Sequence, residues 1–309
     1  MKPVQLRSRD ADVEIAPDIG GSIAAFQWRG HDVLRPADRD ARNAGNVRQY
    51  ACYPLVPYSN RIASATLRLR DGTTHNLARN FGDHPHAIHG VGWQRPWSVE
   101  IAEPAYALLS LQHNCAHEGA VAWPFSFRAT HAMALSSQSR TATLTMTLTL
   151  TNVDTRAFPF GLGWHPFFPR NRGTVLGFRA AGVWKTDATR LPTRLVRIPD
   201  SMCFDPPRAI DGAVLDHVFT GWDGHASLTQ PEHGYRVILE ADRSCDHLVV
   251  FVPSDRDYFA VEPVTHMTDA FNCYARGDEH TGTRILRPGK AYSCTMRIVV
   301  SLHEPPEPS

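Results

Sequence analysis

Apolar and polar residues alternate without interruption from Thr141 to Thr151. One face of this segment carries only threonine, and the other carries Ala142, Leu144, Met146, Leu148 and Leu150. A period of two is that of a half-buried β-strand, and threonine favours strands over helices. The pattern therefore predicts a long strand with one buried face.

Other segments show weaker forms of the same pattern. Strands are predicted at Val13–Ile15, Ser22–Trp28, Thr66–Leu69, Trp97–Ile101, Ala107–His113, Phe125–Ala134, Tyr235–Glu240, His247–Val252, Tyr258–Val261 and Tyr292–Leu302. Turn dipeptides separate many of them, such as Asp71-Gly72 and Pro288-Gly289. Helical turns are expected only near Arg39–Ala44 and Thr268–Phe271.

Closely spaced strands without intervening helices indicate an all-β sandwich or barrel. No linker or change of composition divides the chain, so residues 1–303 are predicted to form one domain. The last six residues, Glu304–Ser309, have the composition of a disordered tail.

Composition narrows the class of partner. Apolar residues make up 42% of the 309 residues, which is ordinary for a soluble globular protein. The formal net charge of +1 argues against nucleic acid or an anionic membrane as a partner. No signal-like or membrane-length apolar run is present, so a cytoplasmic protein is expected. The six cysteines form no Cys-x-x-Cys motif, which disfavours a zinc knuckle or a redox centre.

Three distant runs each place ionisable groups among apolar residues, at 86–93, 161–168 and 258–264. A buried imidazole or carboxylate needs a partner. If the runs converge, His89, His165 and Glu262 form one acid–base site. Their reference pKa values, about 6.5 for histidine and about 4.3 for glutamate, can be moved toward neutrality by burial and by each other.

Two of these groups precede proline, in His165-Pro166 and Glu262-Pro263. A residue before proline favours extended backbone, and proline lacks the amide that a sheet ladder needs. Both groups are therefore expected where a strand ends, at a place where a sheet protein can open a cleft.

Several other residues have a functional and a structural interpretation. Arg61, beside Asn60, is either a surface cation or a planar donor for ligand hydroxyls. Asp216 either caps a turn or accepts hydrogen bonds from a sugar. Three aromatic residues either stack on a sugar ring or belong to the core: Trp93, Trp164 and Phe259.

A metal site is the weaker interpretation of the histidines. His84 and His86 would share one face of a strand, whereas His89 would point to the other face. No acidic ligand lies at a suitable spacing, so a metal-free site is favoured. Neither a Gly-x-x-x-x-Gly-Lys phosphate loop nor a Gly-x-Ser-x-Gly elbow is present.

At these residues the chain resembles the aldose 1-epimerase (galactose mutarotase) family, from about Gly20 to Val300. The matching runs are Asn60-Arg61-Ile62, Ile88-His89-Gly90, His165-Pro166-Phe167-Phe168, Leu215-Asp216-His217, Val261-Glu262-Pro263 and Asp269-Ala270-Phe271-Asn272. The resemblance implies a large antiparallel β-supersandwich with few short helices, in agreement with the strand pattern.

The resemblance also implies roles. Glu262 would be the general base, His165 the general acid, and His89 would assist at the ring oxygen. Sugar hydroxyls would be held by Asn60, Arg61 and Asp216, with Trp93 and Trp164 as further substrate contacts. The partner would be an aldohexose or aldopentose, with no cofactor and no metal, and the protein a monomer or homodimer. We expect His165 and Glu262 to face each other across a gap one sugar ring wide.

The sequence leaves the substrate open. Well-known galactose mutarotases carry Asn-His-Pro-Tyr-Phe-Asn where this chain has Trp164-His165-Pro-Phe-Phe-Pro169, so another aldose or a sugar phosphate is possible. A non-catalytic carbohydrate-binding sandwich and a metal-dependent sandwich enzyme are also compatible with the pattern. A glycoside hydrolase would need two flanking carboxylates, and Glu262 with Asp216 is the pair to consider.

Overall fold

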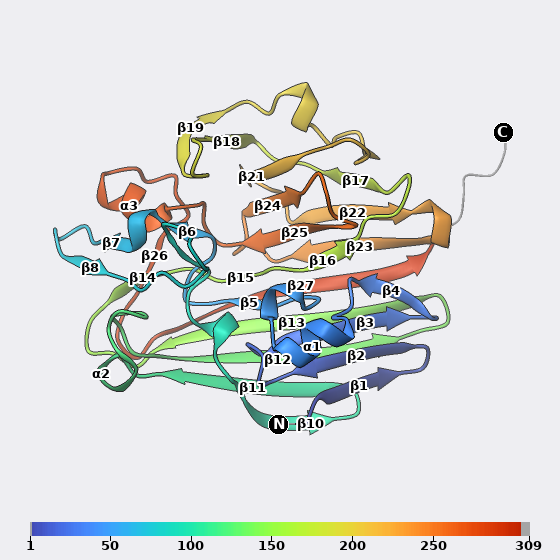
Figure 1. The fold of residues 1–309 in the computed structure, drawn as a ribbon, viewed down its shortest axis with the longest axis horizontal. Helices are drawn as coiled ribbons and strands as arrows, with labels where there is room; N and C mark the ends of the chain where they lie inside the picture. The colour runs from blue at the N-terminus through green and yellow to red at the C-terminus, as the bar shows by residue number, and fades with distance from the viewer. Residues whose placement is uncertain (1, 304–309) are drawn as a thin grey trace.

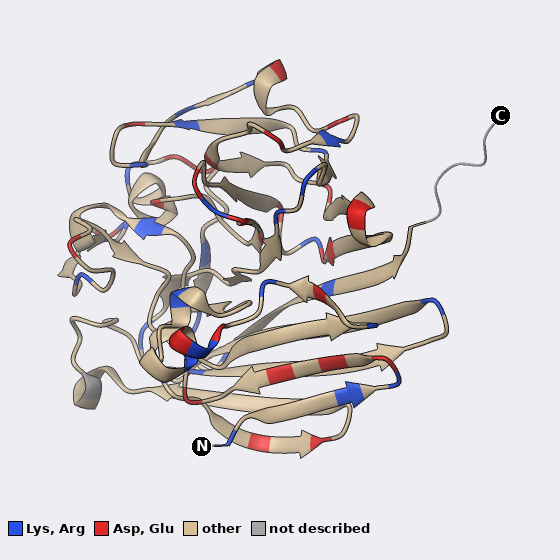
Figure 2. Cartoon of the chain, turned by 45° about the vertical axis from the view of Figure 1, so that its right-hand side comes forward, with Lys and Arg blue, Asp and Glu red and all other residues tan. Residues whose placement is uncertain are grey.

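The computed structural model describes residues 2–303, and the predicted disordered tail at 304–309 lies outside them. Antiparallel strands dominate, as Figure 1 shows, and the described residues contain three short α-helices. The all-β prediction is therefore confirmed. No helix in residues 2–303 is both long enough and apolar enough to cross a membrane. Basic and acidic residues are scattered over the chain in Figure 2, in keeping with its small net charge.

The larger of two main sheets has nine strands. In spatial order they are β10 (Ser98–Glu103), β11 (Tyr106–His113), β12 (Phe127–Ser137), β13 (Thr141–Asn152), β27 (Ala291–Leu302), β23 (Tyr235–Ala241), β22 (His225–Gln230), β17 (Val175–Phe178) and β20 (Arg208–Ala209). The apolar residues of β13 are buried and its threonines are half-buried, as the alternation predicts. On the threonine face, Thr147 Oγ1 lies 3.1 Å from Thr295 Oγ1.

The second main sheet has eight strands. Its path runs through β19 (Pro192–Val196), β18 (Gly182–Thr186), β21 (Leu215–Thr220), β24 (His247–Val252), β25 (Tyr258–Val264), β15 (Gly163–Trp164) and β5 (Pro54–Leu55), and β16 (Phe167–Pro169) also pairs with β25. Trp164 on this sheet donates from Nε1 to Nε2 of His131 on β12, at 3.1 Å. Both residues are buried, so the two main sheets meet at this contact.

Smaller elements complete the fold. A four-stranded sheet contains β1 (Val4–Ser8), β2 (Ala11–Ala16), β3 (Ser22–Trp28) and β4 (His31–Leu34). Three strand pairs are β14 (Phe158–Phe160) with β26 (Arg284–Leu286), β6 (Arg61–Ile62) with β9 (Ala87–Ile88), and β7 (Thr66–Arg68) with β8 (Thr74–Asn76). Single 3₁₀ turns lie at Val47–Gln49, Ala63–Ala65, Gly92–Gln94, Asp200–Met202 and Pro231–His233.

The helices follow the sequence signals in part. Helix α1 spans Arg39–Ala44 as predicted, because Asp38 accepts the Ala41 amide and Gly45 ends the helix at a φ of +59°. Helix α3 (Ala270–Ala275) starts later than the turn predicted at Thr268–Phe271. Helix α2 (Cys115–Glu118) was not predicted.

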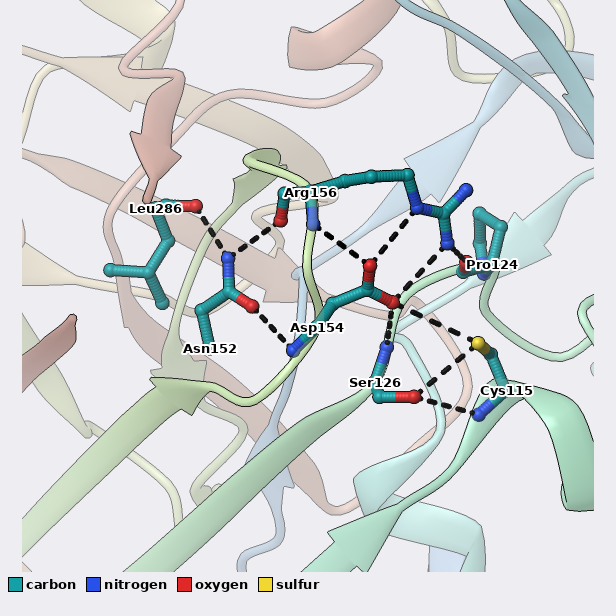
Figure 3. Close-up of polar contacts among 7 residues, drawn as sticks. All are labelled: Cys115, Pro124, Ser126, Asn152, Asp154, Arg156 and Leu286. Atoms are coloured by element: carbon teal, nitrogen blue, oxygen red, sulfur yellow. Dashed lines mark hydrogen bonds and ion pairs between the residues drawn. The ribbon is translucent and has the colours of Figure 1, made fainter. Parts of the chain in front are cut away.

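A polar cluster fixes the turn that follows β13 (Figure 3). Asp154 accepts from the amides of Ser126 (2.9 Å) and Arg156 (3.0 Å), and from Arg156 Nε (3.0 Å). Asn152 donates to the carbonyl of Leu286 at 2.8 Å, which ties the turn to β26. Burial opposes ionisation of Asp154, but these donors outweigh it and lower the pKa of the carboxyl to about 2.

Candidate active site

A cavity of about 510 Å³ opens over one face of the eight-stranded sheet. Its volume suits a small ligand. The chain places six of the predicted site residues on its wall: Asn60, Arg61, His89, His165, Asp216 and Glu262. The three distant runs singled out in the sequence therefore converge.

Strand register explains which side chains reach the cavity. Asp216 on β21 pairs with Phe251 on β24, and Phe251 pairs with Ala260 on β25. Side chains two residues apart on a strand share a face, so Glu262 lies on the same side of the sheet as Ala260. Asp216, Phe251 and Glu262 all line the cavity, as this register requires.

The candidate acid and base are in direct contact. His165 Nε2 lies 3.2 Å from Glu262 Oε1, and the two residues are only 8% and 2% exposed. The expectation that they face each other across a sugar-wide gap is therefore wrong. Two neighbouring oxygens of a ligand, rather than opposite sides of a ring, would match a pair this close.

The strand-end prediction holds for one of the two residues. His165 lies between β15 and β16, where the chain leaves the ladder. Glu262 instead lies inside β25, paired with Val249. The strand tolerates Pro263 because its other neighbour breaks: β16 pairs as far as Ala260, and β15 pairs only with Val264.

Burial shifts the pKa values of Glu262 and His165 in the directions that favour the neutral form of each side chain. Desolvation raises the pKa of Glu262 well above its usual value, and the charge of Asp216 adds to this. Desolvation and the charge of Arg35 lower the pKa of His165 to about 3. Glu262 Oε2 and His165 Nδ1 are buried without a hydrogen-bond partner. These shifts favour a pair that holds one proton in total, which one member can accept while the other donates.

His89 is held in one tautomer. Its Nδ1 accepts the backbone amide of Asn60 at 3.0 Å. Desolvation and the charges of His165 and Arg61 lower its pKa well below the usual value, so the ring is neutral. The proton therefore lies on Nε2, which can donate toward a ligand. The ring also lies close to His165, with centroids 5.4 Å apart.

The turn around His89 has little freedom. His89 has a φ of +63° and Gly90 a φ of +70°. A Cβ on Gly90 would lie 2.3 Å from the carbonyl oxygen of Val56. This position therefore requires glycine, and the close approach fixes His89 against the Asn60 loop.

Polar side chains form the next part of the wall. Arg61 donates from Nη1 to Oδ1 of Asn60 at 2.9 Å, and its Nη2 lies 3.4 Å from Asp216 Oδ2. Arg190 Nε lies 3.5 Å from the same carboxylate oxygen. Asp269 holds the backbone that follows Arg61 and Ile62, because it accepts the Ala63 amide at 2.9 Å. The arrangement leaves a planar donor and a carboxylate side by side at the cavity.

The three predicted stacking residues do not line this cavity. Trp164 is fully buried because neighbouring residues of an extended strand point to opposite faces: His165 faces the cavity and Trp164 faces the core. Phe259 is buried for the same reason, next to Tyr258, which lines the cavity. Trp93 donates to the carbonyls of Ile88 and Gly90 and packs behind His89. The core interpretation applies to all three.

Other residues take the place of the tryptophans. The cavity is also lined by Arg48, Tyr53, Phe167, Arg256 and Tyr258. Period-two spacing from Glu262 could have indicated Tyr258, and the same spacing from His165 could have indicated Phe167. No local signal marks Arg48, Tyr53 or Arg256, since loop and strand packing alone bring them to the cavity.

The described residues offer no separate metal centre. No group of three or more His, Cys, Asp or Glu side chains within 2–303 is arranged to hold a metal ion. His84 and His86 do lie close, with ring centroids 5.1 Å apart. However, His84 Nδ1 accepts the His86 amide and His86 Nδ1 accepts the Ser64 amide, so one nitrogen of each ring is already occupied by a backbone hydrogen bond.

An antiparallel supersandwich with a buried His–Glu pair in an open cavity defines a galactose mutarotase-like protein. The family model for aldose 1-epimerase matches residues 4–299. The chain belongs to the aldose 1-epimerase family, and the resemblance seen in the sequence is confirmed.

Relatives agree with this assignment. An uncharacterised Escherichia coli K12 protein, YphB, is 28% identical over 291 residues, which cover 92% of this chain and 93% of YphB. A crystal structure of an Escherichia coli K12 protein described as a candidate aldose 1-epimerase has a TM-score of 0.86 at 26% identity, covering 97% of this chain and 99% of that one. A galactose mutarotase-like protein of Clostridium acetobutylicum shares the fold, with a TM-score of 0.81 at 20% identity over 96% of this chain and 94% of that one.

Proposed function

We propose that this protein is a mutarotase that interconverts the α and β anomers of a free aldose. The observation that carries the proposal is the contact between His165 Nε2 and Glu262 Oε1 at the wall of an open cavity. A module that only binds sugar has no need for a buried, desolvated acid–base pair. Family membership supports the same reaction class.

The reaction needs one proton removed and one delivered at oxygens bonded to the same carbon. In the reactive form the one proton of the pair has moved from Glu262 to His165 across their 3.2 Å contact. Glu262 then takes the proton from O1, the O1 electrons form the C1=O1 double bond, and the C1–O5 bond breaks. Its electrons go to O5, which takes a proton from His165. The contact distance suits this chemistry, because O1 and O5 are themselves neighbours.

Ring closure is the reverse of opening on the other face. After rotation about C1–C2, His165 takes the proton back from the O5 hydroxyl, O5 attacks C1, and Glu262 returns its proton to O1. The number of protons on the pair is unchanged by a complete cycle. Each positioned acid or base contributes about 10²–10⁴-fold to the rate.

The remaining wall residues hold the sugar. His89 donates from Nε2 near the ring oxygen. Asn60, Arg61 and Asp216 provide donors and acceptors for the other hydroxyls, with Arg61 and Asp216 already oriented by their 3.4 Å contact. Tyr53 and Phe167, rather than the tryptophans, supply the aromatic surface beside the sugar.

One observation favours anionic sugars as a second class of substrate. Arg48 and Arg256 line the cavity in addition to Arg61. Arg61 contacts Asp216, but Arg48 has no carboxylate partner among the described residues and lies over the Phe81 ring at 4.8 Å. A phosphate or carboxylate on the sugar would find a cation there.

Polarimetry or NMR tests the proposal directly. Freshly dissolved α-anomers of glucose, galactose, arabinose, fucose and glucose 6-phosphate are followed with and without the protein. We expect faster equilibration of at least one sugar, and loss of that acceleration in His165→Gln but not in His225→Gln, an exposed histidine on β22. Equal rates with and without protein for every sugar would reject a mutarotase.

A further inference from the structure

Arg35, which the sequence did not mark, lies behind the cavity wall. Its guanidinium carbon is 4.2 Å from the ring centroids of both Phe167 and Tyr258. It donates to the carbonyls of Arg48 at 3.1 Å and Tyr50 at 2.9 Å. The Arg35 amide also donates to the Phe167 carbonyl at 2.8 Å. Its main chain and side chain are thus both fixed against the same strand, β16.

This cation is compensated without an ion pair. No carboxylate of the described residues lies within ion-pair distance of Arg35, and Asp257 acts on it only through its longer-range field. Two carbonyls and two aromatic faces take the place of an anion. Because no negative charge is paired with Arg35, its positive charge still acts electrostatically on neighbouring groups.

Phe167 connects Arg35 to the acid–base pair. The Phe167 ring stacks on the His165 ring with centroids 4.4 Å apart and planes 29° apart. His165 in turn contacts Glu262. Guanidinium, phenyl, imidazole and carboxylate are thus in successive contact, and the Phe167 ring contacts both the guanidinium of Arg35 and the ring of His165.

We propose that Arg35 is a positioning residue that fixes the His165 ring through Phe167 and, by its charge, favours release of the proton from His165. The proposal rests on the mutarotase function proposed above. A fixed cation opposes a second cation nearby, and an intervening apolar ring screens this repulsion poorly. The same repulsion favours the step in which His165 gives its proton to O5, and opposes the step in which His165 takes that proton back.

The other groups that face His165 leave this role to Arg35. Tyr53, whose ring centroid lies 4.8 Å away, is neutral because burial raises its pKa. Burial likewise keeps the Cys52 thiol and the His89 ring neutral. Glu262 shares the single proton of the pair, so the remaining charged groups are Arg61 and Arg35.

Arg61 and Arg35 differ in how far their charges are neutralised. The charge of Arg61 is neutralised in part by its contact with Asp216. Burial is the largest cause of the lowered pKa of His165, and the charge of Arg35 is the second largest. Arg35 therefore has a larger electrostatic effect on His165 than Arg61 has.

Three variants test the proposal. Arg35→Met removes the charge. Arg35→Lys keeps the charge but loses the planar guanidinium that stacks on the two rings and donates to two carbonyls. Arg208→Met is the control. Arg208 lies in the same way over the Phe204 ring, at 4.5 Å, and donates to two carbonyls, but Phe204, unlike Phe167, does not line the cavity. The readouts are the pH profile of kcat/KM and the ¹⁵N titration of the His165 imidazole, assigned by comparison with His165→Gln.

In Arg35→Met we expect the His165 titration and the acid limb of kcat/KM to move up by about one pH unit. The reason is the loss of repulsion between two charges that the contacts through Phe167 hold no more than about 9 Å apart. In Arg35→Lys we expect an acid limb close to that of the unmodified protein, with kcat lowered several-fold and KM little changed. Circular dichroism at each pH confirms that the variants are folded.

The outcomes separate this proposal from the proposed function. An unmoved His165 titration in folded Arg35→Met, or a shift of equal size in Arg208→Met, overturns the electrostatic role. If Arg35→Met does not fold, unaltered kcat in Arg35→Lys overturns the positioning role. The NMR titration needs no turnover, so a protein inactive on every sugar would reject the mutarotase while leaving the effect of Arg35 on His165 measurable.

Discussion

The backbone amide of Asn60 donates to Nδ1 of His89 at 3.0 Å. The loop that carries two candidate sugar contacts, Asn60 and Arg61, therefore also decides which nitrogen of His89 bears the proton. A neutral imidazole with one nitrogen occupied in this way is a fixed donor rather than a proton shuttle.

His89→Asn tests this donor. The amide of asparagine can still accept the Asn60 N–H, but it does not reach as far into the cavity as Nε2. We expect kcat to fall by roughly 10- to 100-fold, the cost of a lost hydrogen bond of about 1.5–3 kcal/mol. Initial rates by polarimetry measure kcat and KM. Unchanged values of both in His89→Asn would show that His89 only supports the loop.

Glu262→Gln removes the candidate base without changing side-chain volume. We expect kcat to fall by about 10²–10⁴-fold. Thermal unfolding should change little, because the buried carboxyl, whose pKa is raised, already favours its neutral form. Glu240→Gln, on an exposed pair with Arg297 at 3.1 Å, is the matched control and should keep full activity. Near-normal turnover in Glu262→Gln would remove the carboxylate from the mechanism.

Asp216→Asn separates binding from chemistry. The change releases Arg61 and Arg190 from their shared carboxylate, at 3.4 and 3.5 Å, and removes an acceptor for sugar hydroxyls. We expect KM to rise by roughly tenfold, one hydrogen bond with a charged group, with a smaller change in kcat. Steady-state kinetics over a range of sugar concentrations decide it. A fall in kcat alone would instead connect Asp216 to the ionisation of Glu262.

Trp164→Phe tests the assignment of this residue to the core. The variant loses the 3.1 Å hydrogen bond to His131 and leaves that imidazole nitrogen buried without a partner. We expect the free energy of unfolding to fall by about 1–3 kcal/mol, while KM stays unchanged. Urea unfolding and kinetics on the same preparation measure both. A large rise in KM with unchanged stability would restore a contact with sugar.

Asp154→Asn probes the turn after β13. The pKa of Asp154 is about 2 in the folded chain against about 3.9 in an unfolded one, so its ionisation stabilises the fold above about pH 4. That stabilisation, about 2 kcal/mol, is lost as the pH falls from about 4 to 2.

We therefore expect Asp154→Asn to be less stable at pH 7 and to lose less stability than the unmodified protein on acidification, as measured by urea unfolding at pH 7, 4 and 3. Asp71→Asn is the comparison variant: its carboxyl accepts the Thr73 amide in a fully exposed turn, so we expect a change of the same sign but smaller, because solvent screens the interaction. Parallel stability–pH curves for Asp154→Asn and the unmodified protein would contradict this account.

Strand segments with a clear period of two were predictable from the sequence. Ser22–Trp28 and His247–Val252 have the predicted bounds, and Thr141–Asn152 extends its prediction by one residue. Two-residue strands such as Gly163–Trp164 were missed because an alternation must repeat over several residues to be recognised. Asp216 was predicted as a site residue although its strand, Leu215–Thr220, was not.

The sequence by itself determined the all-β class, the family, and the ionisable groups that proline and glycine hold in extended runs. These are local properties, since periodicity and backbone restriction act over a few residues. The tertiary structure alone decided that His165 contacts Glu262, that Trp164 faces the core, and that Arg35 lies behind Phe167. Each of these depends on the register between strands far apart in the chain, where a shift of one residue reverses every side chain.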